Sequence, residues 1–379
     1  MAKVSKIATY KRIFSSEYIS DKKTGDIDKF INGRNHYFFF AARLGILSII
    51  DALKFKPGDI VLLPSILPEG VLLPFKKRNI RYIFYEVNDQ LEPEIGNLIN
   101  LLNNNSVKIL LVIHYFGKEV NIQTLRKSLP LKDTLIVEDC AHCFHSESQF
   151  GTNFVGYEGD ITLYSLNKFL PIPDGSLIVF NNKELINRLS LNIRNQSFTV
   201  GIAFLFSWLS IFFKSLHVQM NGIWIMDLFS KVFYALYYKI LCSLNKPFKI
   251  SNYSKRIITS FYLQQWSFER NKNFIIINDE LSNNFKRLIT SNLKGITAPG
   301  FPIIFNNIDV KNEVKRLLKS KGIEVLSYKS RWFYKDKLIS QKNTVTNKSF
   351  DGHLLLPINT YIDKKQLQLM ISLLNENNK

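Results

Sequence analysis

The stretch that decides the fold runs from Val137 to Phe180 and reads VEDCAHCFHSESQFGTNFVGYEGDITLYSLNKFLPIPDGSLIVF. It begins at the end of an apolar run that has the pattern of a buried strand and that closes with an acidic pair ending in Asp139. A second predicted strand, 160–165, leads into Lys168, and a Pro/Gly turn then precedes a third apolar strand. We therefore expect neighbouring strands to deliver a carboxylate and an amine at their ends.

This pair of groups is what pyridoxal phosphate chemistry requires. The amine of Lys168 would hold the cofactor as a Schiff base, and the carboxylate of Asp139 would keep the pyridine nitrogen protonated so that the ring acts as an electron sink. Each residue also has a simpler explanation, because a lysine after a strand is usually solvated and a carboxylate in this position is often a helix cap. The combination of the two residues is what favours the cofactor.

Around this stretch, apolar strands alternate with amphipathic helices. The predicted strands are 60–63, 82–87, 107–113 and 135–137, and the predicted helices are 41–53, 69–77, 95–102 and 122–129. Near-continuous apolar strands in this alternation predict an α/β fold with a mostly parallel sheet covered on both faces. Ligands of such sheets bind at the carboxyl ends of the strands, where Asp139 and Lys168 both fall.

The composition divides the chain into four expected segments. Residues 1–30 form a polar, basic N-terminal arm, and residues 31–196 form the large domain. Residues 197–250 form an apolar helical insertion, and residues 251–379 form a smaller C-terminal α/β domain. The smaller domain has predicted strands at 301–305 and 353–356 and predicted helices at 310–321 and 364–374.

The insertion allows three interpretations, because the chain carries no charge from Asn195 to Phe213. Its helices could pack on the enzyme or on a partner subunit, lie in the surface of a membrane, or span it. We expect packing for most of the segment and lipid contact at its tip. The aromatic residues that suggest lipid contact are Phe204, Phe206, Trp208, Phe212, Phe213 and Trp224, flanked by Lys214, Lys231, Lys239 and Lys246.

Charge and cysteine content narrow the class of protein. The chain has 379 residues, a formal net charge of +19 and a pI near 9.6, a balance that attracts nucleotide-linked substrates or anionic lipid. No nucleic-acid-binding motif is recognised, so we expect no nucleic-acid partner. Three cysteines suit a reducing compartment, and we find no signal peptide at the N-terminus. We expect a cytoplasmic protein, peripheral at the inner face of the membrane if the insertion meets lipid.

Two places could hold the cofactor phosphate, which needs backbone N–H groups at a helix start. Ala41, Ala42 and Arg43 open the first long helix with small residues, for which ordinary packing is the simpler explanation. Ser165, just before the lysine, could add a hydroxyl group.

The segment from Asp139 to His145 also contains C-x-x-C and H-x-x-H spacings. Structural zinc normally takes such pairs from two separated places in the sequence, and no second cysteine pair is present. Four ligands so close in sequence would also be sterically awkward. We therefore expect no metal site here.

Five motifs in order resemble those of the DegT-type sugar aminotransferases, a family of fold type I pyridoxal phosphate enzymes. Each motif is weak alone, and the order of all five makes the resemblance specific over most of the chain. The motifs are Lys56 to Ser65 (a Gly-Asp-x-Val-x-x-Pro type), Val112 to Gly117, Glu138 to His142, the bracket of Gly159-Asp160-Ile161 and Asp174-Gly175 around the lysine, and His353 to Ile358.

The resemblance implies roles for particular residues. Lys168 would bind the cofactor covalently, and Asp139 would pair with the pyridine nitrogen. His142 would lie near the phenolic oxygen of the cofactor. Ser165 and the helix start at Ala41, Ala42 and Arg43 would hold the phosphate.

The chain also departs from the family pattern, which predicts a divergent subgroup. Ser165 lies three residues before Lys168, where many members have five, and Ser176 replaces a glycine. No aromatic residue occurs in 66–68, where the family often has one that stacks on the cofactor. The Asn-Tyr-Arg motif that the second subunit donates in the family is only partly matched, by Asn252-Tyr253-Ser254.

The resemblance implies an aminotransferase that moves an amino group from glutamate to a nucleotide-linked keto-sugar in surface polysaccharide or lipopolysaccharide biosynthesis. It also implies a homodimer. One alternative is another pyridoxal phosphate reaction on sugars, such as a lyase or dehydratase, although related dehydratases have a histidine in place of Lys168. Another is a non-catalytic, membrane-docked member of a polysaccharide assembly.

Overall fold

The central sheet of the computed structural model carries the candidate site. The structure describes residues 7–8, 18–19, 25–56, 58–151, 153–219, 224–328, 333–335 and 350–377. Within these ranges, seven strands pair in the order β2-β9-β8-β7-β6-β3-β5. Their bounds are β2 (Asn35–Phe39), β3 (Ile60–Pro64), β5 (Arg81–Tyr85), β6 (Val107–Ile113), β7 (Leu135–Asp139), β8 (Ile161–Tyr164) and β9 (Ser176–Phe180).

The sheet is parallel from β5 to β8 and antiparallel at β9 and β2. Strands β3, β8 and β9 are buried along their whole length, as expected for strands covered on both faces. This confirms the predicted α/β fold with a mostly parallel sheet.

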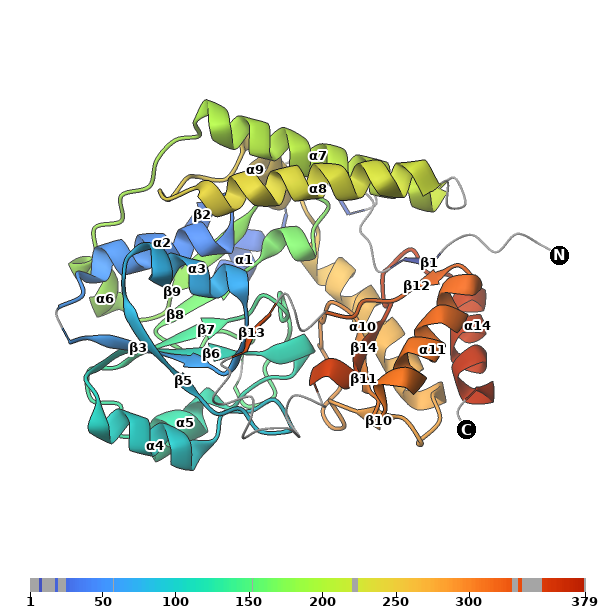
Figure 1. Ribbon diagram of the computed structural model, residues 1–379, viewed down its shortest axis with the longest axis horizontal. Helices are drawn as coiled ribbons and strands as arrows, with labels where there is room; N and C mark the ends of the chain where they lie inside the picture. Colours follow the sequence, from blue (N-terminus) through green and yellow to red (C-terminus); the bar gives the residue numbers. More distant parts are fainter. Residues whose placement is uncertain are drawn as a thin grey trace.

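Helices cover both faces of the sheet (Figure 1). Helices α4 and α5 lie on one face, and α2, α3 and α6 lie on the other. The bounds are α1 (Ile27–Ile31), α2 (Ala42–Leu53), α3 (Glu69–Lys77), α4 (Ile95–Asn104), α5 (Ile122–Ser128) and α6 (Lys183–Arg188). These covering helices leave the carboxyl ends of β6, β7 and β8 facing the smaller domain.

The smaller domain is built on a three-stranded antiparallel sheet of order β10-β11-β14. Its strands are β10 (Lys286–Arg287), β11 (Phe301–Ile304) and β14 (His353–Leu356). Helices α10 (Leu263–Glu280), α11 (Ile308–Ser320) and α14 (Lys364–Glu376) lie beside these strands (Figure 1). Two short pairs complete the described strands, β1 (Ile7–Ala8) with β12 (Ile323–Glu324) and β4 (Ile66–Pro68) with β13 (Phe333–Lys335).

Two long helices, α7 (Phe198–Gln219) and α8 (Trp224–Ser243), lie side by side along one edge of the molecule (Figure 1). Helix α7 is long and apolar enough to cross a membrane. Its stretch Phe198–His217 has a mean hydropathy of 1.6, and 33% of an 18-residue segment within it is buried inside the protein. However, Val200 and Ala203 of α7 are fully buried in a cluster with Phe40 and Leu44. Helix α7 is therefore packed on the large domain.

The predicted elements match the observed ones closely, with two kinds of difference. Strand β2 and the antiparallel direction of β9 were not expected, and neither were α1, α6, α9 (Asn252–Thr259) or α10. Part of the expected N-terminal arm is structured, because β1 pairs with β12 and α1 begins at Ile27. The remainder of 1–24, apart from 7–8 and 18–19, and the insertion tip at 220–223 lie outside the described residues. The division into four segments stays a prediction.

Candidate active site

Asp139, His142 and Lys168 converge at the carboxyl ends of β7 and β8. Asp139 is the last residue of β7, and His142 follows it in a tight turn. Strand β8 ends at Tyr164, and a 3₁₀ turn, η2 (Leu166–Lys168), then presents the lysine. Lys168 Nζ lies 3.2 Å from His142 Nε2. The structure thus brings together three residues that the sequence predicts for one site.

The hydrogen bonds of His142 indicate the protonation state of this pair. The backbone N–H of Phe116 donates to His142 Nδ1 at 3.2 Å, so Nδ1 carries a lone pair. The proton of the neutral imidazole then resides on Nε2, which donates to Lys168 Nζ as acceptor. A lysine that accepts a hydrogen bond is in its neutral form, which is the nucleophilic form of the amine.

The surroundings of Lys168 also disfavour its charged form. Packing of protein atoms around Nζ lowers the pKa of Lys168, and the nearby Asp139 carboxylate opposes this shift. The residue as a whole is exposed, so solvent moderates the shift and a ligand can reach the side chain. Burial likewise lowers the pKa of His142 well below its ordinary value, with Lys168 adding to the effect.

Asp139 is buried at the base of this group. Its Oδ1 accepts a hydrogen bond from Ala141 N at 2.9 Å, which is the local turn expected of a capping carboxylate. Burial raises the pKa of Asp139, while its interaction with the nearby Lys168 opposes that shift. The hydrogen bond to Ala141 supports a structural role for Asp139, and its role toward the cofactor stays a prediction.

An aromatic stack lines the site beside Lys168. The rings of Phe116 and His142 are stacked at 5.5 Å with planes 15° apart, and Tyr328 stacks on His142 at 5.2 Å. His353 of β14 stacks on Phe116 at 4.3 Å. The stack joins the large domain to the smaller one. Sequence reasoning missed Tyr328 because it lies about 160 residues from Lys168 in a segment without a motif.

The start of α2 adjoins the lysine turn through the backbone. Gly175 N donates to Phe40 O at 2.9 Å, and Asn167 N donates to Gly175 O at 3.1 Å. No side chain caps α2, so its first N–H groups, at Ala42 and Arg43, suit an external anion. Phosphate binding at this helix start stays a prediction.

The side chains of Arg43 and Ser165 have partners within the protein. Arg43 donates through Nη1 to Cys242 Sγ at 3.1 Å, and its guanidinium lies over the ring of Tyr238 at 5.1 Å. Both partners belong to α8. Ser165 Oγ donates to Asn167 Oδ1 at 3.1 Å. Any phosphate contact from Arg43 in this arrangement would come from its backbone N–H.

A buried carboxylate, Asp174, fixes the turn that follows the lysine. Its oxygens accept hydrogen bonds from Ser251 N and Ser251 Oγ, each at 2.7 Å, and from Ser254 Oγ. Ser251 also caps α9. The segment Asn252-Tyr253-Ser254 therefore contacts the lysine turn of its own chain, a contact that sequence reasoning did not predict.

A second buried pair, His114 and Glu138, supports β6 and β7 from below the site. His114 Nδ1 accepts from Val120 N, and Nε2 lies 2.9 Å from Glu138 Oε2. The ligand atoms of His114, Glu138 and Cys140 lie within 4.8 Å of one another. Both ring nitrogens are already engaged, and burial raises the pKa of the Cys140 thiol well above its ordinary value. Their present hydrogen bonds suit a structural role.

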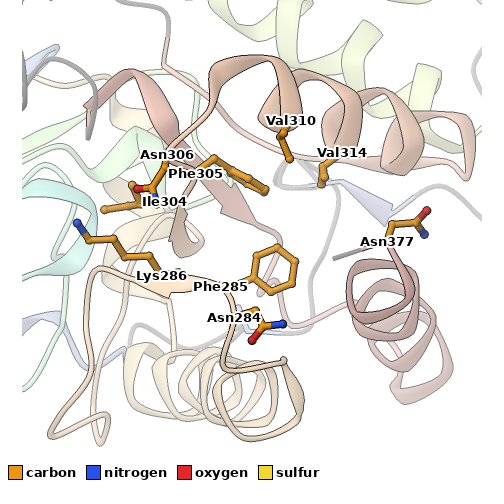
Figure 2. Close-up of a pocket in the computed structure, with 9 residues that line it drawn as sticks. All are labelled: Asn284, Phe285, Lys286, Ile304, Phe305, Asn306, Val310, Val314 and Asn377. Atoms are coloured by element: carbon orange, nitrogen blue, oxygen red, sulfur yellow. The ribbon is translucent and has the colours of Figure 1, made fainter. Parts of the chain in front are cut away.

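A pocket of about 100 Å³ lies in the smaller domain between α11 and the β10 region (Figure 2). Phe285, Val310 and Val314 line it, with Lys286 at one side. Ligand pockets usually measure roughly 300–1,000 Å³. This pocket is too small to compete with the Lys168 region as the candidate active site.

The fold is similar to that of several solved structures. A mostly parallel seven-stranded sheet with a smaller antiparallel domain matches solved aminotransferases of fold type I. One is NtdA from Bacillus subtilis with bound PMP, at 16% identity and a TM-score of 0.62, covering 93% of this chain and 75% of that one. Another is PseC from Helicobacter pylori, at 14% identity and a TM-score of 0.60, covering 99% and 98%.

The sequence comparisons point to one family. A profile of the DegT/DnrJ/EryC1/StrS aminotransferase family matches residues 41–203. The chain is 23% identical over 155 residues to the GDP-perosamine synthase of Vibrio cholerae, a match that spans 40% of this chain and 41% of that protein. Residues 41–203 thus resemble the DegT/DnrJ/EryC1/StrS aminotransferases, and the sequence likeness is distant.

Proposed function

We propose that this protein transfers an amino group from glutamate to a nucleotide-linked keto-sugar during surface polysaccharide biosynthesis. The observation that carries the proposal is the convergence of Lys168, His142 and Asp139 at the carboxyl ends of β7 and β8. The sugar substrate follows from the family and from the name of the Vibrio cholerae relative. We further infer a cytoplasmic homodimer from the resemblance to the family.

The chemistry of the residues present fits pyridoxal phosphate. The exposed Lys168 offers a neutral amine, and the buried Asp139 offers a carboxylate that interacts with it. The stacked rings of His142 and Tyr328 offer flat faces beside the amine. The uncapped start of α2 offers backbone N–H groups for a phosphate. When bound, the cofactor would supply an electron sink for the carbon that loses its proton.

Each residue then has a defined task. Lys168 Nζ would bind the cofactor covalently and afterwards carry the proton between donor and acceptor carbons. Asp139 would keep the pyridine nitrogen protonated. His142 would orient Nζ through the hydrogen bond that Nε2 donates, because its other nitrogen is fixed by Phe116 N.

Absorption spectroscopy tests the proposal. The purified protein mixed with pyridoxal phosphate should absorb in the visible, and glutamate should shift the spectrum as the cofactor takes up the amino group. Lys168→Ala should abolish the protein-bound absorbance, whereas Lys183→Ala, at an exposed lysine beyond β9, should not. A wild-type protein that gains no visible band would contradict the proposal.

The sugar half of the proposal needs its own measurement. After glutamate treatment, GDP-linked and UDP-linked keto-sugars should be compared for their ability to restore the original spectrum. Restoration by either would support a nucleotide-sugar acceptor. Restoration only by small keto acids would overturn the sugar assignment and leave the cofactor assignment in place.

A further inference from the structure

The outward face of α8 carries an apolar ridge. Trp224, Leu228, Val232 and Leu236 follow one another at intervals of four residues, with 71%, 48%, 46% and 39% of their surface exposed. Residues four apart lie above one another on a helix. Phe229, 41% exposed, widens the ridge at its middle. Contiguous exposed apolar surface of this kind usually marks a contact site.

The opposite side of α8 is firmly packed, so the ridge is not the result of a loosely placed helix. Tyr237 and Leu241 are buried in a cluster with Val200 and Ala203 of α7. Ser210 Oγ of α7 donates to Ser230 O of α8 at 2.9 Å. Both faces of α8 are thus defined, one facing the protein and one facing outward.

The aromatic residues of α7 that suggested lipid contact are half-buried and lie outside this ridge. The ring of Phe233 on α8 lies 5.9 Å from Phe206 and stacks at 5.6 Å on Phe213. Trp208 and Phe212 stack on each other at 5.3 Å. Of the aromatic residues named for lipid contact, Trp224 is the one with a mostly exposed side chain.

Basic residues share the outward face with the ridge. Lys231 and Lys239 are exposed and, by the helical period, fall on the same side as Leu228 and Val232. Asp227 bonds Lys231 at 2.6 Å and also Lys214 at 3.0 Å, so it offsets part of this charge. Those bonds lower the pKa of Asp227 to about 2, which keeps it ionised at neutral pH.

The combination of apolar and basic residues on the outward face of α8 indicates what kind of surface it binds. In a twofold contact through this face, a second copy of the chain would bring its own Lys231 and Lys239 close to those of the first. An anionic membrane accepts both components, because acyl chains receive the ridge and headgroups receive the lysines. Figure 1 shows α7 and α8 running along one edge of the molecule, above both domains.

We propose that the exposed face of α8 docks the protein on an anionic membrane surface, with the Trp224–Leu236 ridge entering the boundary between headgroups and acyl chains. This inference does not rest on the proposed reaction. It places the protein at a membrane without requiring α7 to leave its packed position.

Co-sedimentation with vesicles tests the proposal. The full chain should bind vesicles made of equal parts phosphatidylcholine and phosphatidylglycerol, and binding should weaken as salt rises. Binding to pure phosphatidylcholine should be much weaker. The triple variant L228S/V232S/L236S and the variant K239E should each bind at least about tenfold more weakly. Thermal unfolding should be unchanged in K239E, whose side chain is exposed, and should fall only modestly in the triple variant, whose side chains are only partly exposed.

Matched controls lie on other elements. Phe268→Ser removes a 67% exposed aromatic residue from α10, and Lys365→Glu inverts an exposed charge on α14. Both controls should bind vesicles as the wild type does. Equal losses in the controls would show that overall charge or apolarity acts without the α8 face, and would overturn the proposal.

Sedimentation velocity distinguishes membrane docking from self-association through the same face of α8. If vesicles do not bind and L228S/V232S/L236S shifts the protein to a smaller assembly, a second copy covers the ridge and the membrane proposal is wrong. If vesicles do not bind and the mass is unchanged, the membrane proposal is also wrong. Neither result depends on whether the protein is an active aminotransferase.

Discussion

At the scale of single residues, the state of the Lys168 amine is set by its neighbours. Burial of the atoms around Nζ disfavours the charged form, while the Asp139 carboxylate favours it. Because the first effect is larger, the pKa of Lys168 in the folded protein lies below that of a free lysine. The unfolded chain therefore binds more protons between these two pKa values, and this lysine makes stability rise with pH across that window.

The reactivity of Lys168 should follow the same titration. We predict that its rate of modification by pyridoxal phosphate, trapped with borohydride, rises with pH and levels off below pH 10.5, the ordinary pKa of lysine. Lys168 in the urea-unfolded protein should serve as the comparison and level off at higher pH. Identical profiles in the folded and the unfolded protein would show that the site does not tune the amine.

Replacing Asp139 by Asn should change the amine and the reaction in different ways. Loss of the negative charge should lower the pKa of Lys168 further and move its modification profile to lower pH. Turnover should fall by roughly 10²-fold because the pyridine nitrogen loses its partner. The Asn side chain can still accept from Ala141 N, so folding should survive. Unchanged turnover together with an unchanged profile would leave Asp139 with only a capping role.

At the scale of elements, Asp174 connects the lysine turn to α9. Its carboxylate satisfies three donors from Ser251 and Ser254 in a fully buried position. Asp174→Ala would leave these donors without an acceptor, and we predict a loss of about 3 kcal/mol in the free energy of unfolding. The matched control is Asp363→Ala at the exposed cap of α14, which should cost about 1 kcal/mol.

Equal losses in the two variants, measured by denaturant unfolding, would show that Asp174 acts only as an ordinary cap. A selective loss of cofactor binding in Ser254→Ala, with little change in stability, would instead suggest that α9 has a direct part in the site.

The elements that could be predicted are those whose hydrophobic pattern is decisive. Strands such as Val107–Ile113 and His353–Leu356 have continuous apolar runs, and their bounds agree with the prediction. Strand β2 was missed because Asn35–Phe39 carries polar residues at its start and is mostly half-buried. The direction of β9 could not be read from its sequence, since an apolar strand has the same pattern in either direction.

At the scale of the whole molecule, the two domains meet closely at Gly117. This residue has a φ of +93°, and a Cβ there would lie 2.5 Å from the Cβ of Ala298 in the smaller domain. We predict that Gly117→Ala lowers the free energy of unfolding by roughly 1–3 kcal/mol from the strained backbone alone, with the steric conflict adding to it. Denaturant unfolding measures the loss.

The steric part can be isolated with Ala298→Gly. In a double-mutant cycle, the combined variant should be more stable than the sum of the two single losses predicts, because the methyl groups no longer collide. Additive losses would show that the domains do not touch at this point.

The residues of the candidate site that follow strand ends could be predicted from the sequence. The residues that reach the site from distant parts of the chain could not. Asp139 and Lys168 are adjacent in space because β7 and β8 are neighbours and parallel, which the alternating pattern indicates. Tyr328 reaches His142 from the smaller domain, and Cys242 reaches Arg43 from α8. Single-sequence patterns carry no information on such contacts between separate units.

The central claim is that Lys168 is the residue that binds the cofactor. The most direct test treats the full-length protein with pyridoxal phosphate and borohydride, digests it, and maps the labelled peptide by mass spectrometry. The account predicts a single label on Lys168, prevented by prior addition of glutamate. A label on another lysine, or none on the folded protein, would contradict it.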